Sequence, residues 1–210
     1  MANTAGPASG AYMFNNKWLS DVLLRVHGTD GTIVEFPAHR ERLVTRSAYF
    51  MKMFNENSFK EAKEKVVDLK DVDLKHFEIA LYWMYTKEER DVEDETVAEL
   101  LENVVLLYHI ADFYIIPSLL QHCVDRFRDG AMQNFDSKSD EFRAALLDAA
   151  DLYYKTCAET ESSLGRCVVK LVQKVKWTKD DNVGDLQKML KKHPLFALDY
   201  ALETTRQNSV

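Results

Sequence analysis

Features that define several protein classes are scarce or missing in this chain of 210 residues. Its cysteines, Cys123, Cys157 and Cys167, are odd in number and far apart, which is typical of a reducing compartment rather than of a disulfide framework. No apolar run reaches the roughly 18 residues that a membrane-spanning helix needs. The seven glycines never form a glycine-rich turn before a helix, so no phosphate loop is expected. We therefore expect a protein of the cytoplasm or nucleus that acts without a membrane.

An excess of positive charge is also missing. The net charge is −7 and the isoelectric point is about 5.4, which argues against a phosphate-rich partner. Lysines do recur late in the chain, at Lys170, Lys174, Lys188, Lys191 and Lys192. Aspartates interleave with them, so we interpret them as solvated helix faces and expect no direct contact with nucleic acid.

Constellations that carry chemistry are equally hard to find. His39 could form a triad with Ser47 and Asp21, but no Gly-x-Ser-x-Gly turn or oxyanion hole accompanies them. A histidine between a strand and a helix more often stabilises the fold through hydrogen bonds. His122 and Cys123 are adjacent on a predicted helix and point about 100° apart, so they cannot chelate one ion alone. We predict no catalytic residue, no metal site, no cofactor and no small-molecule substrate.

The first part of the chain alternates between strand and helix patterns. Residues 21–26 and 32–36 predict a hairpin, with Pro37 ending its second strand. Helices are expected over 41–46 and from Ser47, which can cap the second of them. Residues 65–69 predict a third strand, and Asp73 is placed to cap the helix that follows.

The later part is helical. A helix from Thr96 is interrupted at Ile116-Pro117, and the next is expected to stop at Gly130. Residues 133–139 are a polar connector, and helical stripes follow within 142–153, 168–175 and 186–190. His193-Pro194 then interrupts the pattern before 195–202. The class is α+β, a small sheet under helices followed by an all-helical extension.

A composite pattern in the first part identifies the family. It runs Ser20-Asp21-Val22, Pro37-Ala38-His39-Arg40, Ser47-x-Tyr49-Phe50, Phe59-x-Glu61, Val67-x-Leu69-x-Asp71-Val72 and Tyr82-x-x-Tyr85-Thr86. In this order the residues resemble a BTB/POZ domain. The resemblance covers about Trp18 to Phe127, and the arrangement looks like the small BTB proteins of fungi. We expect a flexible leader over 1–17, the BTB/POZ domain over 18–130 and a helical extension over 136–205.

The resemblance also implies a function. Phe59 and Glu61 match the hydrophobic-x-Glu motif through which many members contact a cullin-3 scaffold, so they are candidate partner-binding residues. Asp21 and Arg40 occupy positions where the family has an acidic and a basic residue that meet in a pocket near a dimer interface, beside a structural His39. The alternative for Phe59 is that its ring covers the core beneath the loop. The alternative for Asp21 and Arg40 is that the pair fixes the first strand against the first helix.

Two functional classes remain from the sequence. The first is a protein-interaction module: a substrate adaptor or scaffold for a cullin-3-type ubiquitin ligase, or else a BTB-mediated transcriptional regulator or an assembly scaffold without a ligase role. We expect a homodimer because many members of the family that this chain resembles form dimers, although the leader before the first strand is short. The second class is an enzyme of unrecognised type, which would need a concave site with converging titratable groups. We expect no enzyme.

Overall fold

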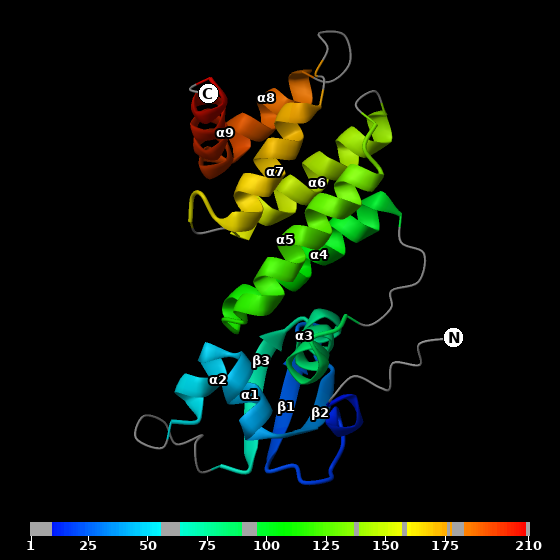
Figure 1. The fold of residues 1–210 in the computed structure, drawn as a ribbon, viewed down its shortest axis with the longest axis vertical. Coiled ribbons are helices and arrows are strands. Elements are labelled where there is room, and N and C mark those ends of the chain that lie inside the picture. The colour runs from blue at the N-terminus through cyan, green and yellow to red at the C-terminus, as the bar shows by residue number, and fades with distance from the viewer. Residues whose placement is uncertain are drawn as a thin grey trace, which may run out of the picture. The chain divides into compact units, whose positions relative to one another are not determined.

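The computed structural model describes residues 10–55, 64–89, 96–136, 139–156, 159–175, 177 and 183–208 (Figure 1). Its contacts divide the chain into two compact units. The first unit comprises Met1–Val92 and Leu107–Leu120, and the second comprises Glu93–Leu106 and Gln121–Val210. The first holds a sheet with helices, and the described part of the second is helical. The expected α+β class with a helical extension is confirmed.

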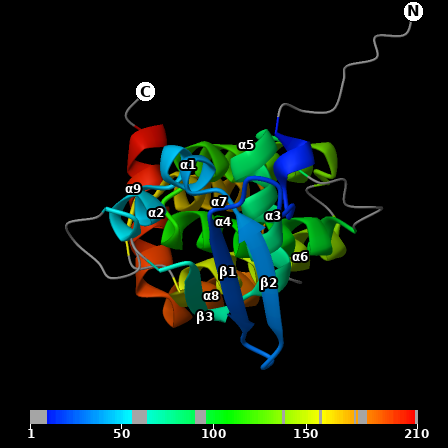
Figure 2. The same cartoon turned by 90° about the horizontal axis from the view of Figure 1, so that it is seen from below.

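The sheet of the first unit has three strands in the order β2-β1-β3. β1 (Val22–Gly28) lies between β2 (Ile33–Ala38), to which it is antiparallel, and β3 (Val66–Val72), to which it is parallel (Figure 2). The alternation in β1 is as expected, because Val22, Leu24 and Val26 are all buried. This face of the central strand therefore contributes to the core of the unit.

The prediction that the second strand ends at Pro37 is wrong, since β2 continues to Ala38. Pro37 lies opposite Leu23, and β2 is an edge strand. The Gly28 N–H donates to the Thr32 carbonyl at 2.7 Å, which makes this pair hydrogen-bonded. In an antiparallel ladder every second residue of β2, counted from Thr32, bonds to β1, and Pro37 is not among them. The donor that proline lacks would face the free edge, so it is not needed there.

The helices of the first unit begin within one residue of the predicted positions. α1 (Arg40–Arg46) follows β2, and α2 (Ala48–Met53) begins after Ser47, whose hydroxyl accepts from the Phe50 N–H at 3.1 Å. α3 (Leu74–Thr86) is capped by Asp73, which accepts from the His76 N–H at 3.2 Å. Both predicted caps are confirmed. A short 3-10 helix, η1 (Ala11–Met13), precedes the sheet.

Two longer helices follow, and each has one end in the first unit and the other end in the second. α4 (Val97–Phe113) starts with a capping box, in which Thr96 and Glu99 each accept the other's backbone N–H. α5 (Pro117–Gln133) starts at the predicted proline but continues past Gly130, where we expected it to end. A Cβ at Gly130 would lie 2.5 Å from the Leu100 Cδ2 atom. This glycine allows close helix packing instead of ending the helix.

Aromatic rings form the centre of the first unit. The Tyr114 ring stacks on Phe50 with centroids 5.5 Å apart and contacts Phe77 at 5.1 Å. Phe77 in turn meets Phe36 of the sheet at 6.0 Å. All four side chains are at most 2% exposed, and burial raises the pKa of the Tyr114 hydroxyl. This cluster joins the sheet, α2, α3 and the end of α4.

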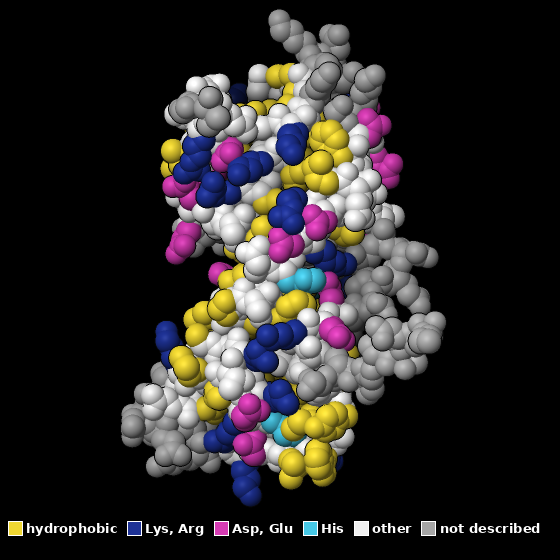
Figure 3. Space-filling model, in the orientation of Figure 1, with side chains coloured by type: hydrophobic (Ala, Val, Ile, Leu, Met, Phe, Trp, Pro, Cys, Tyr) yellow, Lys and Arg dark blue, Asp and Glu magenta, His cyan; other side chains and the backbone are white. Residues whose placement is uncertain are grey.

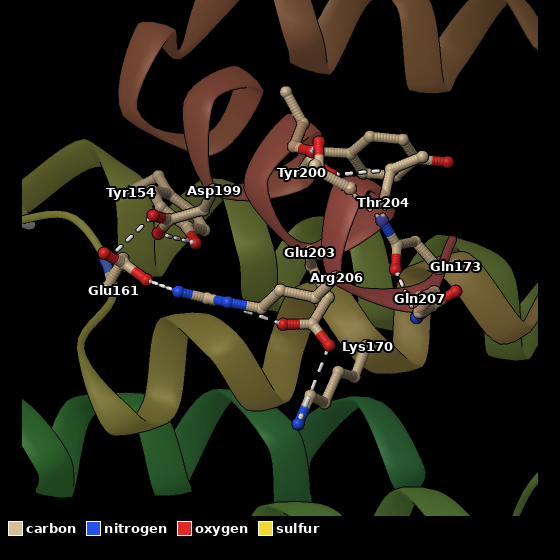
Figure 4. A network of polar contacts seen from close by, with 12 residues as sticks. Tyr154, Glu161, Lys170, Gln173, Asp199, Tyr200, Glu203, Thr204, Arg206 and Gln207 are labelled. Atoms are coloured by element: carbon tan, nitrogen blue, oxygen red, sulfur yellow. Dashed lines mark hydrogen bonds and ion pairs between the residues drawn. The ribbon is translucent and has the colours of Figure 1, made fainter. Parts of the chain in front are cut away.

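The second unit continues with α6 (Asp140–Thr156), α7 (Ser163–Lys174), α8 (Val183–Lys192) and α9 (Pro194–Gln207). The predicted apolar stripes are largely buried, at Phe142, Ala145, Leu146, Ala149, Tyr153, Val168, Leu171, Val172, Val175, Leu186 and Met189. The buried carboxylate of Asp199 holds the start of α7. It accepts the Tyr154 hydroxyl and the Glu161 N–H, both at 2.8 Å (Figure 4). Over the residues that the structure describes, no helix is long and apolar enough to cross a membrane.

Candidate functional site

An exposed apolar surface lies in the first unit where α2 meets the C-terminal end of α4. Its members are Tyr49, Phe113 and Ile115, which we call the α2–α4 surface. Phe113 is 63% exposed, and Tyr49 beside it is half-buried. The rings of Phe113 and Tyr49 lie 5.5 Å apart. Figure 3 shows hydrophobic side chains gathered over α2 and the α4–α5 turn. Exposed apolar groups that cluster in this way are typical of a binding surface.

The backbone of the turn after α4 fixes this surface. The Ala48 N–H donates to the Ile115 carbonyl at 3.1 Å, and the Ser47 hydroxyl donates to the Tyr114 carbonyl at 2.5 Å. Ile115 has φ +49°, a conformation that a β-branched residue rarely adopts. The turn is therefore held by α2, and its strain places an isoleucine side chain 38% exposed at the surface.

The two predicted partner-binding residues, Phe59 and Glu61, lie outside the described residues. Their segment leaves the described chain after Asn55, just past the end of α2, and re-enters it at Glu64 before β3. The role of these two residues stays a prediction.

His39 is buried and bonded on both sides of its ring. Its Nε2 lies 2.7 Å from the Trp18 carbonyl, and its Nδ1 lies 2.9 Å from the Tyr85 hydroxyl. Because a carbonyl only accepts, Nε2 carries the proton, and Nδ1 accepts from Tyr85. Burial raises the pKa of Tyr85 to about 12, so its hydroxyl keeps that proton at neutral pH. His39 thus joins the N-terminal segment, β2 and α3, as a structural histidine would.

Replacing His39 with alanine is expected to lower the free energy of unfolding by roughly 1–3 kcal/mol, because the Tyr85 hydroxyl and the Trp18 carbonyl lose a buried partner. Chemical denaturation measures this loss. His27→Ala is the matched control. His27 bonds Asp68 at 2.8 Å on a more exposed face, where solvent screens such a pair and it contributes little to stability. Equal losses in the two variants would contradict the structural role of His39.

The expected side-chain pair of Asp21 and Arg40 takes a different form. The Asp21 carboxylate accepts from the Arg40 backbone N–H at 2.8 Å, at the start of α1. The Arg40 guanidinium instead lies 4.8 Å above the Phe54 ring and donates to the Glu64 carbonyl at 2.5 Å. The first N–H groups of a helix lack intrahelical acceptors, so a carboxylate is stabilised there without a salt bridge. The contact does fix the start of β1 against α1.

A second exposed apolar group lies in the N-terminal segment. Tyr12, Trp18 and Leu19 are 61%, 56% and 68% exposed, and the rings of the first two lie 6.0 Å apart. Phe14 differs, because its ring packs edge-on against Tyr82 at 5.1 Å. Hydrophobic side chains gather over this segment in Figure 3. The segment is thus fixed by Phe14 and His39 while three of its apolar side chains face outward.

Sequence reasoning did not single out Phe113 and Ile115. The available signal was position: Phe113 lies two residues past Ala111, the last member of the buried α4 stripe, so it falls on the opposite face of the helix. An aromatic residue there, next to the break at Ile116-Pro117, is a usable indication of an exposed anchor. Within the described ranges, no group of three or more His, Cys, Asp or Glu side chains could hold a metal ion.

The comparisons with known proteins agree with this fold. The model of the BTB/POZ domain family matches residues 11–130, so the chain belongs to the BTB/POZ domain family, a protein-interaction fold rather than an enzyme family. Kelch-like protein 40 of Xenopus tropicalis is 35% identical over 104 residues, which are 50% of this chain and 15% of that protein. Kelch repeat and BTB domain-containing protein 2 of Homo sapiens is 30% identical over 155 residues, 74% of this chain and 21% of that protein.

Among solved structures, the BTB domain of zebrafish PATZ1 matches 52% of this chain and 76% of its own at 25% identity, with a TM-score of 0.39. Compared with the Kelch-containing relatives that it matches, this chain spans about a fifth or less of their length.

Proposed function

We propose that this chain is an adaptor or scaffold that binds a cullin-3-type subunit of a ubiquitin ligase, in the cytoplasm or nucleus. The binding site would combine the α2–α4 surface with Phe59 and Glu61, the hydrophobic-x-Glu motif that contacts such a scaffold in many BTB proteins. The observation that carries the proposal is the exposed Phe113 ring beside Tyr49, next to the helix from which the Phe59 segment leaves.

The chemistry of this surface suits a protein partner. Aromatic side chains give most binding energy when a partner pocket takes them up fully, and neighbouring apolar groups keep water out. Tyr49 supports Phe113 through ring contact, so little conformational freedom would be lost on binding. A carboxylate such as Glu61 at the rim would act chiefly on association rate and on salt sensitivity.

Phe113→Ala is expected to weaken binding to a purified cullin-3 N-terminal fragment about tenfold, which corresponds to about 1.4 kcal/mol. Isothermal titration calorimetry measures the affinity. Ile33→Ala is the matched control, because Ile33 is 56% exposed in the same unit but lies at the hairpin end of β2. A tenfold loss in the control, or none in Phe113→Ala, would remove the α2–α4 surface from the proposal.

We further propose that a second copy of the chain covers Tyr12, Trp18 and Leu19. Three large apolar side chains more than half exposed in one short segment are costly in water and favour an occupant. Sedimentation equilibrium at micromolar concentration should give about twice the 24.3 kDa of one chain. Trp18→Ser combined with Leu19→Ser should shift it to the single mass. A purely monomeric unmodified protein would contradict the dimer.

A further inference from the structure

In the second unit, α5, α7 and α9 enclose a groove of about 260 Å³ that the proposed function does not use. α7 forms its floor, and one neighbouring helix forms each wall. The residues that line it are Arg128, Met132, Cys167, Lys170, Leu171, Lys174, Glu203 and Gln207.

The lining repeats with the period of a helix. Cys167, Leu171 and Lys174 lie at i, i+4 and i+7 along α7, and each wall contributes two residues four positions apart. Seven positions along a helix span about 10 Å. The floor is therefore long enough for about three residues of an extended chain.

One wall contains a buried carboxylate, that of Glu203. Glu203 is 5% exposed, and its Oε2 has no hydrogen-bond partner. Its nearest cations are the Lys170 Nζ at 3.7 Å and an Arg206 guanidinium nitrogen at 3.6 Å, both beyond hydrogen-bond distance (Figure 4). Its Oε1 faces Lys170, which lines the groove, whereas the unpartnered Oε2 faces Arg206, which does not, so Glu203 gives this wall a carboxylate beside Lys170 and no free acceptor.

The other feature is a lysine for which the described residues show no carboxylate partner. Lys174 is exposed at the end of α7, and its closest polar contact among the described residues is the Met132 Sδ at 4.0 Å. Arg128, by contrast, already pairs with Asp125 at 2.9 Å and Asp129 at 3.0 Å. Although the whole chain is acidic, charges beyond about 8 Å are screened at physiological salt, so the groove presents a local positive charge to a partner.

The thiol in the floor does not suggest chemistry. Burial raises the pKa of Cys167 to about 11, which keeps it protonated at neutral pH. A protonated thiol is a poor nucleophile and packs as a small apolar group. The floor of Cys167 and Leu171, with the 45% exposed Met132 beside it, is thus an apolar trough with a cation at one end.

We propose that this groove binds a short acidic segment of a partner protein. An apolar side chain of the segment fills the trough over Leu171, and a neighbouring carboxylate pairs with Lys174. A peptide supplies both groups within about 10 Å, whereas a nucleic acid has no aliphatic side chain to fill the trough. The inference uses residues of the second unit only and does not depend on cullin binding.

A random dodecapeptide library displayed on phage, selected against the full chain, tests the proposal. We expect enriched peptides to carry Asp or Glu within two positions of Leu, Ile, Met or Phe. In fluorescence anisotropy, Lys174→Glu should weaken the enriched peptide at least tenfold. Lys191→Glu is the matched control, since Lys191 is also an exposed lysine in the last turn of a helix and the charge change is identical.

A second pair of variants tests the apolar contact. Met132→Ala should weaken the same peptide about threefold or more, whereas Leu198→Ala, which trims an equally exposed side chain of α9 outside the groove, should not. Phe113→Ala should leave this affinity unchanged even though it weakens cullin binding. Enriched peptides without acidic residues, or equal losses in Lys174→Glu and Lys191→Glu, would overturn the proposal.

Discussion

Tyr114→Ala is expected to lower the free energy of unfolding by about 4 kcal/mol, because the ring is buried and its removal leaves a cavity among the neighbouring rings. Tyr114 is 2% exposed and contacts Phe50, Phe77, Tyr49 and Phe113. About 4 kcal/mol corresponds to nearly a thousandfold change in the folding equilibrium.

The adjacent residue provides the control. Phe113→Ala removes a similar ring that is 63% exposed, so its cost in stability should stay below about 1 kcal/mol. Urea denaturation of both variants measures the difference. Comparable losses would mean that Phe113 belongs to the core and that the α2–α4 surface is not free for a partner. A loss of less than about 1 kcal/mol for Tyr114→Ala would contradict the aromatic centre itself.

The fold could be predicted because local signals and the tertiary structure agree over most of the chain. Ser47 and Asp73 were identified as caps because their side chains accept from the backbone three residues ahead, a contact that depends on local sequence alone. Pro37 and Gly130 were misjudged because their roles depend on neighbours distant in sequence. The free edge of the sheet decides the first, and Leu100 decides the second.

The site was less predictable for the same reason. Exposure of Phe113 depends on which face of α4 the core takes, and the positive φ of Ile115 leaves no pattern in the residue types. The Asp21 carboxylate was expected to meet a guanidinium, but its partner is a backbone N–H that only the folded helix terminus presents. Likewise, the lysines of the late helices gave no sign that Lys174 borders an apolar trough beside a buried Glu203.

Phe59→Ala has the second large expected effect, on binding rather than on stability. An aromatic anchor truncated to alanine typically costs about 2 kcal/mol or more at an interface, roughly a thirtyfold loss of affinity. Glu61→Ala should cost less and should chiefly reduce the association rate and its dependence on salt. If Phe59 instead covered the core, its truncation would destabilise the fold by roughly 3 kcal/mol or more.

The central claim, that this BTB/POZ chain binds a cullin-3-type scaffold through the Phe59 segment, is tested most directly by two numbers from one pair of proteins. These are the melting temperature and the affinity for the cullin-3 N-terminal fragment, measured for the unmodified chain and for Phe59→Ala. The account predicts measurable binding by the unmodified chain, about thirtyfold weaker binding by the variant, and equal melting temperatures. A lowered melting temperature with unchanged affinity, or no binding by the unmodified chain, would contradict it.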